Sequence, residues 1–113
     1  MTKYLISFPS GAMQLDEGGL EQASIDSHAV VREAKDAGVW VFGGGIDESV
    51  RPMLVGADGH AREGTYPQTA HIEGGYAVLE LPDQQAAHEW AAKFAGACRC
   101  EQEVRAFMYD PES

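Results

Sequence analysis

The sequence has few basic residues: eight Lys and Arg stand against 18 Asp and Glu, which gives a formal net charge of −10 at pH 7. A nucleic-acid interface needs clustered Lys and Arg side chains to neutralise phosphates. The basic residues of this chain are scattered and form no cluster. We therefore expect no binding to DNA or RNA.

The chain also lacks a long apolar run. No stretch approaches the roughly 18 apolar residues that a membrane span requires, so we expect no contact with a membrane. The opening residues, Met1-Thr2-Lys3, lead directly into a short strand-like run, which is not typical of a secretory leader. These features predict a cytoplasmic protein.

Cysteine is scarce, and the two that occur, Cys98 and Cys100, are one residue apart. A disulfide between them would be strained, so we expect two reduced thiols. A metal site at this pair would need further ligands, and the next candidate, His88, lies on the preceding predicted helix. The sequence predicts neither a metal nor a cofactor.

Two common motifs of enzymes are missing. Gly43-Gly44-Gly45 lacks the GxGxxG spacing of a phosphate-binding loop and precedes no clear helix. We interpret these glycines as a place where the backbone turns and approaches a cavity closely. Ser7, Ser10 and Ser49 stand in no nucleophile-elbow context.

What the sequence does contain is a pattern of strands and helices in one domain, residues 1–113. Val39–Phe42 is apolar at every position, which is typical of a strand buried on both faces. Asp58-Gly59 marks a hairpin turn. The predicted strands are Lys3–Phe8, Val39–Phe42, Met53–Val55, Ala61–Thr65, Tyr76–Leu81 and Glu103–Tyr109, and the predicted helices are Leu20–Ala37 and Asp83 to Gly96.

The helix ends have recognisable residues. Ser24 is an acceptable N-cap if the first helix starts late, and Gly38 is the expected stop after it. Asp83 is the expected cap of the second helix, and Gly96 its expected end. The order strand-helix-strand, hairpin, strand-helix-strand predicts a ferredoxin-like α+β sandwich, an antiparallel sheet with two helices on one face.

One face of the two predicted strands Tyr76–Leu81 and Glu103–Tyr109 is apolar, and the other combines charged and aromatic side chains. Alternation alone does not fix which of the two faces meets the helices. A single domain needs something to cover such a face, and a second copy of the chain is the obvious candidate. Two sheets packed face to face would enclose a partly polar cavity. We therefore predict a homodimer that binds a small molecule in this cavity.

The spaced motifs resemble those of the YCII-related family, in particular its DGPF branch of small bacterial proteins. The resemblance implies a dimeric α+β barrel built from one YCII-like domain, and a function that is largely unassigned. The residues that carry it are Lys3-Tyr4-Leu5-Ile6, Ala37-Gly38, Val41-Phe42-Gly43-Gly44-Gly45-Ile46, Gly74-Gly75-Tyr76-Ala77-Val78-Leu79, Ala86-Ala87-His88-Glu89-Trp90-Ala91 and Glu103-Val104-Arg105.

The chain departs from this branch at its naming motif. The Asp-Gly-Pro-Phe position falls on Glu63-Gly64-Thr65-Tyr66, so the proline is replaced. The charged residues that follow in relatives fall near Gln68, Ala70 and His71, where most of the charge is gone. The sequence therefore does not support the same chemistry at these positions in this chain.

His28 and Asp47 are the candidate catalytic pair, because they are similar to a helix His and a following Asp that are proposed as the active site of relatives. An Asp bound to one imidazole nitrogen would leave the other as a general base near neutral pH. The alternative is a surface histidine, since His28 lies roughly 140° from the apolar stripe of its helix at about 100° per residue.

The candidate binding residues are His71, Tyr66, Arg105 and Glu80. Arg105 could hold a carboxylate or enolate oxygen of a ligand. The alternative, which we favour, is that Arg105 pairs with Glu80 or Glu103 across adjacent strands. His71 could equally be a solvated loop residue, and Tyr66 could serve packing.

Two functions are compatible with these residues. The first is acid-base catalysis of an isomerase, lyase or hydrolase type on a small organic molecule, with His28 and Asp47 as the pair. The second is a non-catalytic module that binds a small ligand or regulates a partner. The sequence leaves open which of the two applies.

Overall fold

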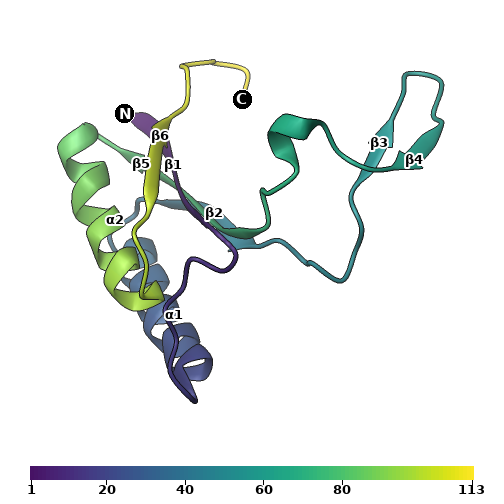
Figure 1. The fold of residues 1–113 in the computed structure, drawn as a ribbon. Coiled ribbons are helices and arrows are strands. Elements are labelled where there is room, and N and C mark those ends of the chain that lie inside the picture. The colour runs from purple at the N-terminus through teal and green to yellow at the C-terminus, as the bar shows by residue number, and fades with distance from the viewer.

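The computed structural model describes residues 1–113. The chain forms a four-stranded sheet, two helices and a separate two-stranded hairpin (Figure 1). In chain order the elements are β1 (Thr2–Pro9), α1 (Gly19–Asp36), β2 (Trp40–Gly45), β3 (Met53–Val55), β4 (Ala61–Glu63), the 3-10 turn η1 (Pro67–Thr69), β5 (Gly74–Leu81), α2 (Gln84–Cys98) and β6 (Glu103–Ala106).

The four strands lie in the order β2-β5-β1-β6, and every neighbouring pair is antiparallel. Tyr4 of β1 lies opposite Leu79 of β5 on one side and Ala106 of β6 on the other. The predicted α+β class with an antiparallel sheet is therefore confirmed, and this strand order is compatible with a ferredoxin-like arrangement.

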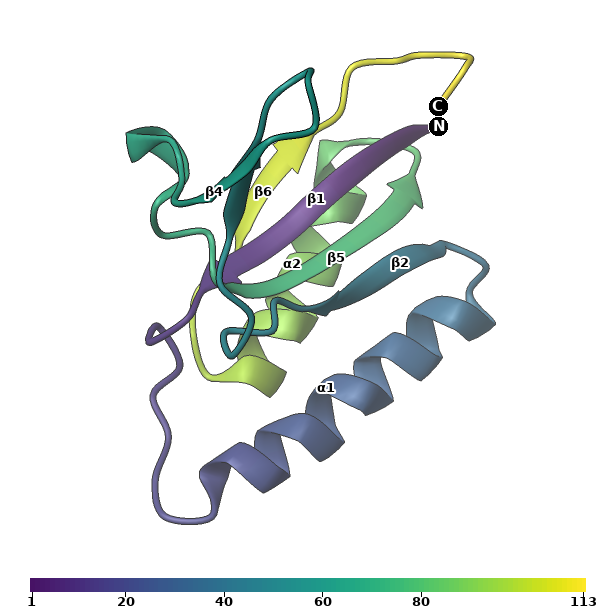
Figure 2. The same ribbon diagram turned by 90° about the vertical axis from the view of Figure 1, so that its right-hand side faces the viewer.

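Both helices lie on the same side of the sheet (Figures 1 and 2). Side chains of β1 and β5 that point to this side meet apolar side chains of α2 and the end of α1. Successive side chains of a strand point to opposite faces, so all core residues of the sheet lie on the one face that meets the helices. The core consists of Tyr4, Ile6, Ala34, Ala77, Leu79, Leu81, Ala87, Ala91 and Phe94.

The helix ends confirm two of the predicted caps and correct two others. The Asp83 carboxylate accepts a hydrogen bond of 2.9 Å from the Ala86 amide, and Gly38 follows α1 with φ of 75°. Ser24 is not a cap, since α1 already begins after Gly18. Gly96 does not end α2, because burial of the next residues favours continuation to Arg99, which adopts φ of 57°.

The prediction that Val39–Phe42 is buried on both faces is wrong for the single chain. Strand β2 lies at the edge of the sheet, and the Phe42 side chain is 67% exposed. An irregularity between Trp40 and Phe42 turns these two rings to different faces. The last strand is also shorter than predicted, because β6 ends at Ala106.

The segment from residue 46 to residue 73 forms an arm that leaves the sheet on the side away from the helices (Figures 1 and 2). Its tip is the β3–β4 hairpin, with Met53 opposite Glu63 and Val55 opposite Ala61. An isolated two-stranded hairpin is marginally stable in water. The arm also exposes apolar side chains at Ile46, Val50, Met53, Val55, Tyr66 and Ile72.

Neither helix is long and apolar enough to cross a membrane.

Candidate functional site

An open cavity of about 720 Å³ lies between α1 and the helix-facing side of the sheet. It reaches the β2 edge of the sheet, where Phe42 and Tyr76 contribute to its wall. The loop after β1 closes a further side with Met13 and Leu15. Half of the lining residues, 12 of 24, are hydrophobic, so the cavity has both apolar and polar walls.

The floor of the cavity depends on two glycines in neighbouring strands. A Cβ at Gly43 would lie 2.4 Å from the Trp40 ring, and a Cβ at Gly75 would lie 2.6 Å from the Phe8 ring. Both rings thus occupy space that a side chain at the glycine position would fill. Trp40 also lies 6.4 Å, centroid to centroid, from Phe94 of α2.

The wall opposite the floor is formed by one side of α1. Ser27, His28, Val31 and Lys35 line the cavity. Their spacing of three to four residues places them on one side of the helix. His28 is exposed, and its Nδ1 lies 3.5 Å from the Ser24 hydroxyl. The imidazole therefore lies at the mouth of the cavity, where it can reach both ligand and solvent.

The structure does not join His28 to Asp47. Asp47 instead accepts hydrogen bonds from the Ser49 amide at 2.9 Å and the Ser49 hydroxyl at 2.6 Å. These two bonds, the hydroxyl bond first, lower the pKa of the Asp47 carboxyl. Asp47 lines a second cavity, of about 540 Å³, at the base of the arm, and Tyr66 lines it too.

The acidic residue in the same cavity as His28 is Glu48. Its carboxylate accepts a hydrogen bond of 3.1 Å from the Ser10 hydroxyl. Sequence reasoning missed Glu48, although it directly follows Asp47. No signal in the sequence separates the two acids, because β2 ends at Gly45 and the alternation of a strand does not extend to them.

The remaining predicted binding residues lie elsewhere. Arg105 pairs with Glu103 at 3.0 Å, one of the two predicted partners, but along the same strand rather than across strands. Glu80 pairs with Lys3 at 3.5 Å. Both pairs are on the sheet face away from the helices, which follows from the pairing of Leu5 with Arg105 and of Lys3 with Glu80. His71 is exposed on the loop after η1.

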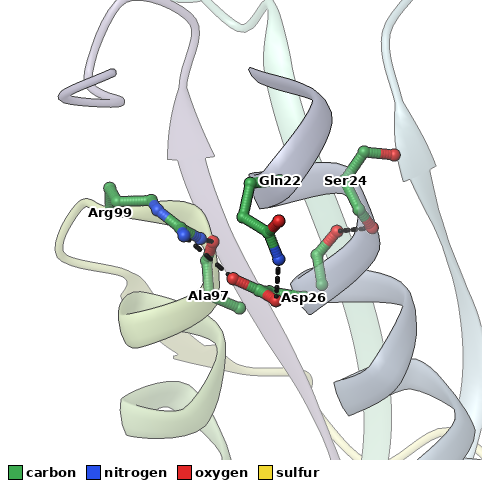
Figure 3. A network of polar contacts seen from close by, with 6 residues as sticks. Gln22, Ser24, Asp26, Ala97 and Arg99 are labelled. Carbon is green, nitrogen blue, oxygen red and sulfur yellow. Dashed lines mark hydrogen bonds and ion pairs between the residues drawn. The ribbon is translucent and has the colours of Figure 1, made fainter. Parts of the chain in front are cut away.

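A polar network holds the first half of α1 against the end of α2 (Figure 3). The Asp26 carboxylate accepts a 2.9 Å hydrogen bond from the Gln22 amide and forms a 2.9 Å ion pair with Arg99. These interactions, that with Gln22 first, lower the pKa of Asp26. Arg99 also donates to the Ala97 carbonyl. The network thereby holds α1, which forms one wall of the cavity, against the end of α2.

The two cysteines are free thiols, and Cys98 lies in the cavity lining. Burial, and then the nearby Cys100, raise the pKa of the Cys98 thiol. Burial likewise raises the pKa of Cys100. A thiol with a raised pKa is a poor nucleophile at neutral pH. No group of three His, Cys, Asp or Glu side chains in the chain is placed to hold a metal ion.

A scan against models of protein families finds none that matches this chain, and a search of curated proteins finds no significant relative. The resemblance to the YCII-related family stays a prediction from the residues that carry it.

Proposed function

We propose that the chain is a small-molecule-binding protein and that the cavity between α1 and the sheet is its ligand site. The observation that carries the proposal is the cavity itself. Its volume of about 720 Å³ falls within the range of about 300–1,000 Å³ that is usual for ligand sites. Its apolar floor and the polar groups His28, Lys35 and Glu48 at its sides also fit such a site.

A fragment screen by NMR tests this proposal, with two matched variants on α1. Ser27 lines the cavity, whereas Ala29 is an exposed residue of α1 that does not. Ser27→Phe places a ring in the cavity, and Ala29→Phe places the same ring on the exposed surface of the helix. We expect fragments that bind the native chain to bind Ala29→Phe equally and to lose affinity for Ser27→Phe.

Two results contradict the proposal. The first is that no fragment binds the native chain at millimolar concentration. The second is that bound fragments are insensitive to Ser27→Phe, because they would then occupy a different part of the surface.

Acid-base catalysis in the same cavity is the second candidate function. His28 and Glu48 both line it, so an imidazole and a carboxylate face one ligand volume. His28 would act as the general base towards a bound small molecule, in a reaction of isomerase, lyase or hydrolase type. In this form of the hypothesis Glu48, which lines both cavities, replaces Asp47, which lines only the second one.

An NMR titration of the His28 ring distinguishes the two carboxylates. If Glu48 supports the imidazole when the site is closed by a ligand, the titration of His28 in the fragment-bound protein changes in Glu48→Gln and not in Asp47→Asn. A titration that responds to Asp47→Asn alone restores the original pair. A titration that responds to neither leaves a binding site without an acid-base pair.

We also propose that two copies associate through the open face, which we define as the sheet face away from the helices. The chain exposes 8000 Å², whereas a compact monomer of 12.2 kDa would expose roughly 6,100 Å². Its radius of gyration is 15.7 Å, against about 13 Å for a compact domain of this length. The open face is formed by Lys3, Leu5, Phe42, Val78, Glu80, Glu103 and Arg105.

The charges of the open face support its association with a second copy. Its two cation-carboxylate pairs, Lys3 with Glu80 and Arg105 with Glu103, leave it without net charge in a chain of charge −10. The excess exposed area, on the order of 1,900 Å², exceeds the about 800 Å² per partner of a standard interface. The arm lies on the same side and would extend around the second copy (Figure 1). Such a pair would be the dimeric α+β barrel that the family resemblance implies.

A further inference from the structure

The helix-facing side of β2 and β5 carries unusually small residues next to the cavity. Gly43 of β2 lies opposite Ala77 of β5, and Gly45 lies opposite Gly75. In a sheet, larger side chains at such positions would stand up towards the helix. Here the Trp40 and Phe8 rings take that space, within 3 Å of where the Cβ atoms of Gly43 and Gly75 would be.

This arrangement places both rings low over the backbone of the sheet. Trp40 and Phe8 are each partly exposed, and both line the cavity. Across the cavity, α1 presents the short side chains of Ser27 and Val31 together with the longer ones of His28 and Lys35. The space between the rings and the helix is therefore bounded by aromatic surface on one side and, on the other, by two small side chains with His28 and Lys35 beside them.

Aromatic rings attract other rings more strongly than their area alone explains, through offset-stacked or edge-to-face contacts. A saturated ring of the same size fills the same volume but lacks these contacts. The aromatic floor of this cavity therefore discriminates in favour of a planar ring.

The charged groups around the cavity indicate which substituent the ring of the ligand carries. The Glu48 carboxylate already accepts a hydrogen bond from Ser10. Lys35 lines the cavity and takes part in none of the six ion pairs of the chain, although acidic residues are abundant. An ammonium group without a protein partner favours an anionic group on the ligand.

We infer that the ligand of this cavity is a planar aromatic carboxylate, whose ring stacks on Trp40 and Phe8 and whose carboxylate pairs with Lys35. This inference rests on the proposed function, because it names the class of ligand for the same site. Ring-over-glycine contacts also stabilise sheets by themselves, so the experiment must separate binding from stability.

Three matched probes test the inference: 2-naphthoate, decahydro-2-naphthoate and 2-naphthamide. Their affinities are measured by following the backbone amide signals of the native chain by NMR. We expect 2-naphthoate to bind about tenfold more tightly than the saturated acid, because only it can stack. We also expect it to bind more tightly than the neutral amide, and to shift the amide signals of Gly43 and Gly75 through its ring current.

Variants of Trp40 separate stacking from a structural role. Trp40→Leu should weaken binding of 2-naphthoate by roughly five- to tenfold while leaving the affinity for the saturated acid unchanged. Trp40→Phe, which keeps a ring, should retain most of the affinity. Trp90→Leu is the control, because Trp90 belongs to α2, packs against the core and does not line the cavity. A general loss of packing in Trp40→Leu would weaken both acids equally.

Equal affinity of the two acids overturns the aromatic part of the inference and leaves the proposed ligand site intact. Equal affinity of the acid and the amide, or no effect of Lys35→Gln, overturns the carboxylate part. If fragments bind in the cavity but none of the three probes does, the ligand class is wrong. If no fragment binds at all, the proposed function itself fails.

Discussion

The Asp26 carboxylate lies 2.9 Å from the Arg99 guanidinium, so one ion pair connects the first half of α1 to the residue that ends α2 (Figure 3). The Arg99 carbonyl in turn accepts a 3.1 Å hydrogen bond from the Gln14 amide. Arg99 therefore contacts both the helix and the loop that form walls of the cavity. Its position explains why a residue with φ of 57° is held there.

Replacing Asp26 by Asn should lower the thermal stability at neutral pH, because the amide cannot form the ion pair. Hydrogen bonds from Gln22 and Arg99 lower the pKa of Asp26 below 3.8 in the folded chain. The contribution of the Asp26 carboxylate to stability is therefore fully present above pH 3.8. It is lost as the pH falls through the pKa that Asp26 has in the folded chain. The measurement is the melting temperature of both proteins between pH 7 and pH 2.

The difference in melting temperature between the native chain and Asp26→Asn should shrink as the pH falls below about 3.8. A constant difference over the whole range would show that the charge of Asp26 is not what stabilises this contact.

Gly43→Ala should destabilise the fold by about 1–3 kcal/mol, the usual range for overpacking. The new Cβ would lie 2.4 Å from the Trp40 ring and 2.9 Å from the Tyr76 carbonyl oxygen, so the ring must move. Urea unfolding gives the free energy, and the tryptophan emission spectrum reports the displaced ring. Gly44→Ala is the matched control, because its Cβ meets nothing within 4 Å. Equal effects of the two substitutions would contradict this account.

Asp83→Ala should lower the free energy of unfolding by about 1 kcal/mol, because the Asp83 carboxylate accepts a hydrogen bond from the Ala86 backbone amide at the start of α2. Asp83→Asn keeps an acceptor oxygen at this position and should retain most of the stability. Chemical denaturation of the three proteins measures the effect. If Asn is as damaging as Ala, the cap hydrogen bond is not the cause.

Phe42→Asp should shift the chain from dimer to monomer, because it places a charge within the proposed interface. An aromatic residue there should be worth a factor of about 30 or more in the dissociation constant. Light scattering during size-exclusion chromatography measures the mass, which is 12.2 kDa for a monomer. Leu20→Asp is the control: Leu20 is 65% exposed, like Phe42 at 67%, but lies on α1.

If the native chain is already monomeric at high concentration, the dimer proposal is wrong. If Leu20→Asp dissociates the dimer and Phe42→Asp does not, the interface lies on the helix side instead.

The order and type of the elements could be predicted from the sequence because they depend on local patterns. Alternation in Lys3–Phe8 and Tyr76–Leu81 identified the two central strands, and their helix-facing residues form the core. Asp83 and Gly38 marked helix ends because capping is a local interaction. The end of α2 was not predictable, since burial of Ala97 and Cys98 overrides the preference of Gly96.

The candidate site was predictable only in part. His28 was singled out because it is similar to a helix His of the family that the sequence resembles, and it does line the cavity of about 720 Å³. The partner was placed at Asp47, whereas the structure brings Glu48 into that cavity and leaves Asp47 bonded to Ser49. In the loop after β2, a shift of one residue decides whether a carboxylate reaches the cavity of His28, and no local pattern reveals it.

The sequence by itself determined the α+β class, the central strands, the two helices and the acidic character, because hydrophobic period, capping and charge are properties of short segments. Only the tertiary structure decided that Trp40 lies over Gly43, that Glu48 shares a cavity with His28, and that Phe42 is left uncovered. These relationships join residues through strand pairing and helix packing, and their geometry depends on how the whole chain folds.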